Sequence, residues 1–265
     1  MTIPVPGPDV RGEADGKVPD AGVALTRTDL VQVFLRSFMF QSLWSYQRMQ
    51  NVGWLFSLWP VFRRLHPDQE ERARVAQDHA GYFNTHPYTA DIILGVVASL
   101  EEKRAQGNPV DREAILAARK SMSGPLSAVG ETVFWATLAP LILIGSVVLG
   151  LVFRRGSWWI TLLSYLIVFN LLHVVVKGGG LLVGYRRGLD VAAFLVQWPV
   201  QRWVGRGAWL GMGLCLGVLA VAVARAWHPA AGTAAAVVVV FFLRRGGSPL
   251  FLPLLAAAAG FFAFH

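Results

Sequence analysis

The chain has 265 residues, of which 54% are hydrophobic and 15% charged, and its mean hydropathy is +0.48. Soluble domains usually carry about a quarter charged residues, so the composition argues against an ordinary soluble protein and indicates an integral membrane protein. The net charge of +8 comes without a basic, aromatic-interleaved tract in a soluble segment, so we do not expect nucleic-acid binding. We assign the Lys and Arg side chains to the cytoplasmic membrane face.

Residues 1–24 are rich in Pro, Gly and Asp and contain no apolar core. They match neither a signal peptide nor a lipoprotein leader, and we expect a disordered cytoplasmic tail. The single cysteine, Cys215, lies in an apolar run. It leaves no room for a disulfide framework or a Cys-based metal site within the chain.

The next stretch begins with Thr26 and Asp29, which fit a capping box that opens a helix. The predicted helix continues through "VFLRSFMFQSLWSYQRMQNVGWLFSLWPVFRRL", where aromatic residues crowd together and polar residues recur at helical spacing. This stretch is too polar for a lipid-facing span and too aromatic for a solvated surface. It predicts a re-entrant helical hairpin that dips into the membrane and is covered by protein.

Residues Pro67 to Tyr82 predict a water-exposed helix with Pro67 at its first position and an i, i+4 ion pair between Glu70 and Arg74. The sequence Asn-Thr-His-Pro at residues 84–87 must then break the helix, because proline disfavours helical backbone in the residue before it.

A short apolar helix, Ile92 to Leu100, follows the break and ends in a run of charge. A helix that spans a bilayer needs about 20 residues, so this segment predicts half of a broken helix pair of the sort that transporters build around a midplane site. Backbone donors and the short polar side chains at the break suit a hydroxyl-rich neutral solute.

The second half is dominated by apolar runs. An amphipathic helix at Asp111 to Lys120 leads through the Gly/Pro-punctuated segment Ser123 to Trp135 into these runs. Glycines recur four apart, as at Gly180, Gly184 and Gly188, and favour close helix packing over a phosphate-binding loop. The predicted spans are Val133–Phe153, Trp158–Val176, Gly207–Ala224, and the shorter Ala230–Leu243 and Pro249–Phe264.

Several of these stretches resemble the IID subunit of the mannose/fructose/sorbose family of bacterial phosphotransferase systems, over roughly Leu25 to His265. They occur in the family's order: "FLRSFMFQSLWSYQRMQNVGW" at 34–54, "HAGYFNTHPY" at 79–88, "ILGVVASLEEKRAQG" at 93–107, "GPLSAVGETVFWATLAP" at 124–140, and more weakly "FNLL" at 169–172, "GYRRGLD" at 184–190 and "LRRGGSPLF" at 243–251.

The resemblance implies a multi-pass subunit of the bacterial inner membrane that forms the sugar pathway with a IIC subunit, as a hetero-oligomer. Cytoplasmic IIA and IIB subunits relay the phosphoryl group, and the hexose-type sugar is phosphorylated as it enters. The IID subunit itself carries no phosphorylated residue. The implied fold is all-α, with re-entrant hairpins and amphipathic helices in residues 25–130 and several transmembrane helices in residues 131–265.

The chain departs from the family pattern at three points. Gln47 replaces an acidic residue, Gly130-Glu131 stands where the family commonly has Gly-Asp, and an extramembrane insertion is missing between His228 and Thr233. Loss of the carboxylate at position 47 removes a strong acceptor for a sugar hydroxyl. These departures motivate an alternative, a non-transporting regulatory or scaffold subunit derived from the same family.

The candidate sugar-binding residues each have a structural alternative. Gln47 and Gln50, with Trp44 one turn earlier, offer amides for hydroxyls and an indole for the apolar face of a sugar, or interhelical hydrogen bonds. Asn84 and Thr85 could bind solute or cap the next helix. The sixth candidate, Glu131, is costly at the mouth of a span unless it is paired, and it could instead hold a hinge, contact a partner or lie at the interface.

No arrangement of nucleophile, base and acid stands out, so we expect no catalytic residues in this chain. His79 and His86 are seven apart with no carboxylate at ligand spacing, and a structural hydrogen bond is the better interpretation than a metal. We expect neither a metal nor another cofactor. Asn170 and His173 share a face of the second span, where they suit hydrogen bonding between helices better than a polar pathway.

Overall fold

The computed structural model describes residues 24–153 and 158–197, with positions 207, 209, 211, 213, 217 and 237 beyond them. Within these residues the chain is helical and has no strands, only isolated bridges at Met49 to Ser45 and to Phe83. The elements are α1 (Arg27–Ser37), α2 (Asn51–Leu65), α3 (Gln69–Asp78), α4 (Ala90–Ala105), α5 (Arg112–Gly130), the π-helix η1 (Glu131–Leu138), α6 (Ala139–Val152), α7 (Trp158–Arg187), the 3₁₀ turn η2 (Gly188–Asp190) and α8 (Val191–Gln197).

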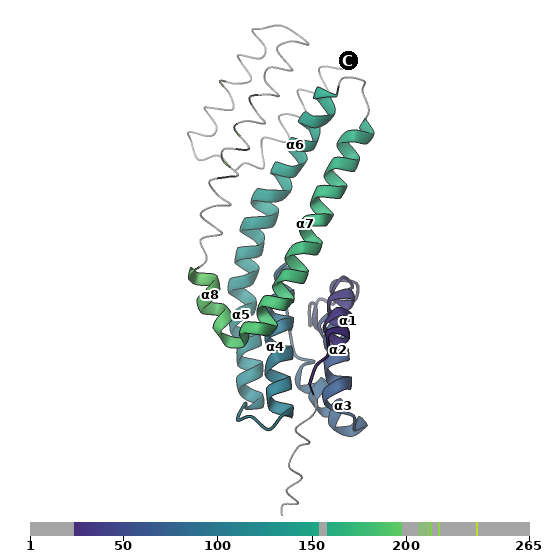
Figure 1. Ribbon diagram of the computed structural model, residues 1–265, viewed down its shortest axis with the longest axis vertical. Coiled ribbons are helices and arrows are strands. Elements are labelled where there is room, and N and C mark those ends of the chain that lie inside the picture. The colour runs from purple at the N-terminus through teal and green to yellow at the C-terminus, as the bar shows by residue number, and fades with distance from the viewer. Residues whose placement is uncertain are drawn as a thin grey trace, which may run out of the picture.

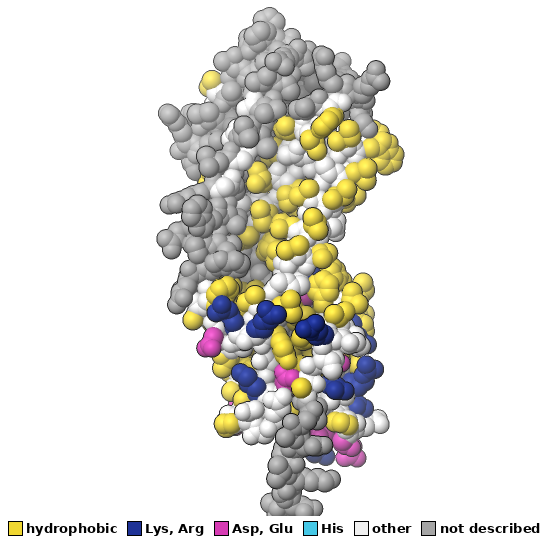
Figure 2. All heavy atoms as spheres, in the orientation of Figure 1, with side chains coloured by type: hydrophobic (Ala, Val, Ile, Leu, Met, Phe, Trp, Pro, Cys, Tyr) yellow, Lys and Arg dark blue, Asp and Glu magenta, His cyan; other side chains and the backbone are white. Residues whose placement is uncertain are grey.

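The long helices form a column. Helices α5, η1 and α6 follow one another without a break, and α7 runs back beside them (Figure 1). Helix α4 packs against the lower parts of α5 and α7, and α1 to α3 lie beside the lower end of the column. Figure 2 shows hydrophobic side chains over the upper part of the described column, whereas Lys, Arg, Asp and Glu gather on the lower part.

Two helical segments are long and apolar enough to cross a membrane, Arg112–Gly150 and Trp158–Leu195. The first includes most of the predicted span Val133–Phe153, and the second includes the whole of the predicted span Trp158–Val176. The three later spans fall outside the continuously described residues, and residues 1–23 of the predicted tail do so as well.

Helix α1 begins as its sequence predicts. Thr26 Oγ1 accepts from the Asp29 backbone N–H at 3.2 Å, and the Asp29 carboxylate accepts from the Thr26 N–H at 2.9 Å. The predicted helix does not continue through the next residues, since α1 ends at Ser37 and α2 starts at Asn51. The intervening segment 38–50, which we name the hairpin loop, folds back so closely on α2 that a Cβ atom on Gly53 would lie 2.0 Å from the Phe40 carbonyl oxygen.

Helix α3 starts two residues later than predicted, because Asp68 rather than Pro67 organises its first turn. The Asp68 carboxylate accepts from the Glu71 N–H at 2.8 Å and acts as the N-cap. The predicted Glu70–Arg74 pair is present at 3.5 Å, but both side chains are exposed, and such pairs contribute at most about 0.5 kcal/mol.

Helix α4 extends beyond the predicted Ile92–Leu100 and is almost wholly buried among α2, α5 and α7. Its contact with α7 depends on glycine. A Cβ atom on Gly95 would lie 2.2 Å from the Leu181 carbonyl oxygen, and one on Gly184 would lie 2.1 Å from the Ile92 carbonyl oxygen. The structure therefore confirms that the four-residue glycine spacing serves close helix packing.

The predicted Gly/Pro-punctuated entry to the first span is helical throughout, including Pro125. The irregularity takes the form of the π-helix η1, which ends just before Pro140. Proline cannot donate to the carbonyl of the preceding turn and its ring crowds that turn, and a widened turn accommodates both effects. The Thr137 hydroxyl fits this geometry, since it donates to the Thr132 carbonyl five residues earlier at 2.8 Å.

Candidate functional site

The structure brings two of the predicted site residues into direct contact. The Gln50 side-chain amide donates to the Thr85 carbonyl, and its oxygen accepts from the Thr85 N–H, both at 2.9 Å. Both residues are buried, and the Thr85 hydroxyl donates a hydrogen bond to the Ser123 carbonyl at 3.0 Å. In this structure these groups join the hairpin loop to the Asn84–Pro87 break and to α5.

Three other predicted residues, Trp44, Gln47 and Asn84, are exposed near this joint. Backbone hydrogen bonds hold their two segments side by side, with the Gln50 N–H donating to the Phe83 carbonyl at 2.9 Å. The exposed surface thus offers an indole, which is 53% exposed, and two free amides within neighbouring segments. Indole faces and amides are groups that suit the apolar faces and the hydroxyls of a polyol.

The sixth predicted residue, Glu131, is exposed at the first position of η1. Its neighbour Gly130 touches the break directly, because a Cβ atom there would lie 2.2 Å from the His86 ring. The π-helix therefore begins where α5 packs against the Asn84–Pro87 segment.

Arg119 of α5 fixes the chain on the other side of the break. Its guanidinium donates to the carbonyls of His79, Gly81 and Tyr82 at 2.8, 3.0 and 2.8 Å. It also lies over the Phe83 ring, 5.1 Å from the centroid. The sign of this role in the sequence is slight: Arg119 is an arginine among apolar positions of an amphipathic helix.

The two histidines of the "HAGYFNTHPY" stretch are buried in different surroundings. His79 Nε2 lies 2.8 Å from Glu101 Oε1, as the predicted structural hydrogen bond requires. The His86 ring stacks against Phe134 at 5.6 Å between centroids, beside Tyr88 at 5.3 Å. Among the described residues, this aromatic cluster also includes Trp135, Phe169 and His173.

The surroundings of His86 keep its imidazole neutral. Burial lowers the pKa of His86 to about 4, and the neighbouring His173 adds to this effect. His86 Nδ1 accepts from the Tyr88 N–H at 3.3 Å, so the proton belongs on Nε2, which has no hydrogen-bond partner among the described residues. Burial likewise raises the pKa of Tyr88 to about 12.

A fully buried ion pair joins α7 to α4. Lys177 of α7 and Asp91 of α4 are 1% and 0% exposed, with Nζ 2.5 Å from Asp91 Oδ2. Burial raises the pKa of the Asp91 carboxyl, and the Lys177 ammonium opposes that rise. Lys177 directly precedes the glycine-rich stretch that the sequence analysis above assigns to helix packing, although a lone lysine within an apolar span is itself a signal of function.

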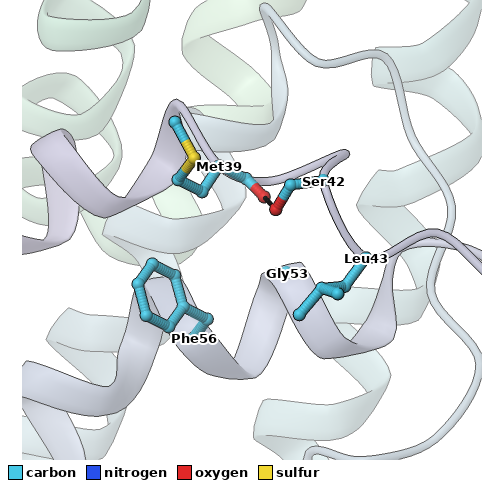
Figure 3. Close-up of a pocket in the computed structure, with 5 residues that line it drawn as sticks. All are labelled: Met39, Ser42, Leu43, Gly53 and Phe56. Atoms are coloured by element: carbon cyan, nitrogen blue, oxygen red, sulfur yellow. Dashed lines mark hydrogen bonds between the residues drawn. The ribbon is translucent and has the colours of Figure 1, made fainter.

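The hairpin loop also forms a pocket of about 320 Å³ lined by Met39, Ser42, Leu43, Gly53 and Phe56 (Figure 3). The Ser42 hydroxyl is already used, since it donates to the Met39 carbonyl at 2.7 Å. The remaining lining is apolar, so the pocket suits an apolar group rather than a sugar.

Comparison with known proteins identifies the family. The family model described as "PTS system mannose/fructose/sorbose family IID component" matches residues 24–240. The mannose-specific EIID component of Escherichia coli K12 is 38% identical over 168 residues, which are 63% of this chain and 58% of that protein. The sorbose-specific EIID component of Klebsiella pneumoniae is 29% identical over 195 residues, 74% of this chain and 69% of that protein.

Solved structures agree in fold. A cryo-EM structure of the mannose transporter ManYZ with microcin E492 contains a chain that matches 91% of this one with a TM-score of 0.59 and 26% identity; 97% of that chain is covered. A second membrane-protein structure matches the same share of this chain with a TM-score of 0.67, 27% identity and 97% of its own length covered. The chain belongs to the family of IID components of mannose/fructose/sorbose phosphotransferase systems.

Proposed function

We propose that this chain is the IID subunit of a mannose-type sugar phosphotransferase permease. It forms the sugar pathway with a IIC subunit, and cytoplasmic IIA and IIB subunits carry out the phosphoryl transfer. The observation that carries the proposal is the family match over residues 24–240. The two apolar helical segments, which suit a membrane subunit, support it.

The sugar in this proposal meets the surface formed by the hairpin loop and the break. Trp44, Gln47 and Asn84 contact it directly, while Gln50 and Thr85 hold the two segments together. Hexoses present an apolar ring face and several hydroxyls, and an exposed indole beside free amides complements both. Glu131 contributes its carboxylate from the start of η1.

The proposed orientation puts the lower end of the column in the cytoplasm. Cationic side chains cluster at the ends of helices there, and the positive-inside rule favours that side; they are Lys103, Arg104, Arg112, Arg186 and Arg187. Between the two spans the sequence carries fewer cationic residues, Arg154 and Arg155. The exposed Trp158 and Trp159 at the opposite end of α7 suit a membrane interface.

In the same proposal the hairpin α1–α2 is re-entrant and the later spans complete a multi-pass subunit of the bacterial inner membrane. The exposed apolar side chains of the hairpin, Val31, Leu35, Met39, Leu43, Val52 and Phe56, support this arrangement. Residues 25–130 form the re-entrant half and residues 131–265 the transmembrane half of one domain.

The test is sugar uptake in a bacterial strain that lacks its own mannose-type permease. The chain is expressed together with IIC, IIA and IIB subunits of a mannose-type system, and uptake of labelled hexoses is measured with phosphoenolpyruvate as the phosphoryl source. We expect phosphorylated sugar to accumulate, and Trp44→Ala or Asn84→Ala to raise KM while the complex with IIC stays intact.

The matched control for Gln47 is Gln41, which is also exposed in the hairpin loop. Gln47→Glu places a carboxylate at the position where the family carries one, so it should change the rate or the sugar preference, whereas Gln41→Glu should not. An intact complex that takes up no sugar in any form would contradict the permease and favour a regulatory scaffold.

A further inference from the structure

The side-chain ammonium of Lys177 is held at a junction of four segments. It donates to Asp91 Oδ2 in the first turn of α4 at 2.5 Å, to the Ser37 carbonyl at the end of α1 at 3.3 Å, and to the Pro87 carbonyl at 3.3 Å. An ammonium has three donors, so these three acceptors use all of them. The Ser37 hydroxyl completes the group by donating to Asp91 Oδ1 at 2.6 Å.

Two of the residues that Lys177 contacts lie at the boundaries of the two segments that form the candidate sugar surface. Ser37 is the residue before the hairpin loop, and Pro87 is the last residue of the Asn84–Pro87 break. The two segments are also joined to each other by the Gln50–Thr85 hydrogen bonds. Each segment is thus fixed by hydrogen bonds at two points. Among the described residues, Lys177 supplies the hydrogen bonds that tie both segments to the long helix α7, and a ring contact between Phe38 and His173 lies beside them.

This arrangement is expensive to build. Moving a charge into a membrane span costs roughly 3 kcal/mol on insertion scales, and a buried ion pair is often no more stabilising than apolar residues of the same volume. Packing alone between α4 and α7 is already supplied by Gly95 and Gly184. Stability therefore does not explain why Lys177 and Asp91 are buried here. Apolar residues, however, could not donate hydrogen bonds to the Ser37 and Pro87 carbonyls and so could not fix their positions.

We propose that Lys177 is a positioning residue for sugar recognition: through Ser37, Pro87 and Asp91 it sets the hairpin loop and the break in the register that presents Trp44, Gln47 and Asn84 together. This inference rests on the proposed function for its effect on sugar, but the positioning itself does not. Displacing recognition groups by a fraction of an ångström weakens binding strongly.

The experiment separates positioning from stability with a single and a double variant of the full chain in its complex. Lys177→Met leaves Asp91 buried without its cation, and we expect the amount of folded protein to fall. Lys177→Met with Asp91→Leu removes both charges, so the amount of folded protein and the melting temperature should recover most of what the single variant loses. The carbonyls of Ser37 and Pro87 remain without a donor in both variants.

The first measurement on the double variant is hydrogen exchange. We expect protection in residues 38–50 and 84–89 to fall about tenfold, as for the loss of one or two hydrogen bonds, while peptides from α2 and α5 keep wild-type protection. The second is uptake, where KM should rise about tenfold with little change in Vmax. Lys120→Met, which removes an exposed lysine on α5, is the matched control and should change neither quantity.

A double variant with wild-type protection in both segments and a wild-type KM would show that the ion pair only stabilises the fold, and would overturn the inference. Should the double variant not fold, Lys177→Arg gives the same comparison: the guanidinium keeps the charge but cannot match the same three acceptors, so both segments should exchange faster. Unchanged exchange in this folded variant would also overturn the inference. Absence of uptake by the wild type contradicts the proposed function alone, because exchange still tests positioning.

Discussion

The Gln50 side-chain amide forms two hydrogen bonds with the backbone N–H and carbonyl of Thr85, which is 35 residues away in the sequence. The amide thus pairs with Thr85 as a peptide group of a neighbouring strand would. Each partner supplies one donor and one acceptor, and both are buried. The hairpin loop is therefore joined to the break with the hydrogen-bonding pattern of a strand pair, although neither segment is a strand.

Replacing Gln50 with Leu should destabilise the protein, because the N–H and carbonyl of Thr85 then remain buried without partners. A buried polar group left unsatisfied costs roughly 1–3 kcal/mol. The measurement is the apparent melting temperature in detergent, followed by tryptophan fluorescence. Gln47→Leu, on the exposed part of the same loop, is the control, and an equal loss in both variants would contradict the role of the pair.

Gly184→Ala should separate α4 from α7. The added Cβ atom would lie 2.1 Å from the Ile92 carbonyl oxygen, which is backbone and cannot rotate away, and such overpacking costs roughly 1–3 kcal/mol or more. We expect less folded protein in the membrane, measured by fluorescence-detected size exclusion of a tagged chain.

Gly179 gives the matched control on the same helix, since a Cβ atom there would meet no atom of the described residues within 4 Å. Gly179→Ala should leave the elution profile unchanged. A normal profile for Gly184→Ala would mean that the two helices are not as close in the membrane as the structure has them.

Arg119→Met should loosen residues 79–83 ahead of the break. Three carbonyls lose a charged donor at once, and hydrogen bonds to charged groups contribute about 1.5–3 kcal/mol each at most. We expect faster hydrogen exchange in this segment and a lower melting temperature. Arg112→Met, which removes a partly exposed ion pair with Asp78, should cost less than about 1 kcal/mol; an effect as large as that of Arg119→Met would contradict the assignment.

The sequence predicted best those features that depend on residues close together in the chain. The capping box at Thr26, the ion pair at Glu70 and the four-residue glycine spacing all act within a few residues or on one helix face, and the structure contains each of them. The apolar length of the first two spans likewise identified them directly.

What the sequence could not supply were contacts between distant segments. The Lys177–Asp91 pair links residues 86 positions apart and the carbonyls held by Arg119 lie up to 40 positions away, so no spacing rule relates them. The sequence predicted a hairpin here but not the place of its turn, because the helical pattern of residues 38–50 is overridden by the fold-back of Phe40 onto Gly53. Six binding candidates could be named by residue type, yet their division into exposed and buried members required the fold.

His86 should make the folded state sensitive to acid. Its pKa is about 6.5 in an unfolded chain and is lowered by burial to about 4 in the structure. Between these values the unfolded chain binds a proton that the folded chain excludes, so this contribution to stability is complete above about pH 6.5 and is lost as the pH falls toward about 4. We expect the melting temperature to decline between about pH 7 and about pH 5. His86→Asn, which keeps an acceptor near Nδ1 for the Tyr88 N–H, should reduce that decline relative to wild type; parallel curves for the two proteins would show that other groups cause the acid sensitivity.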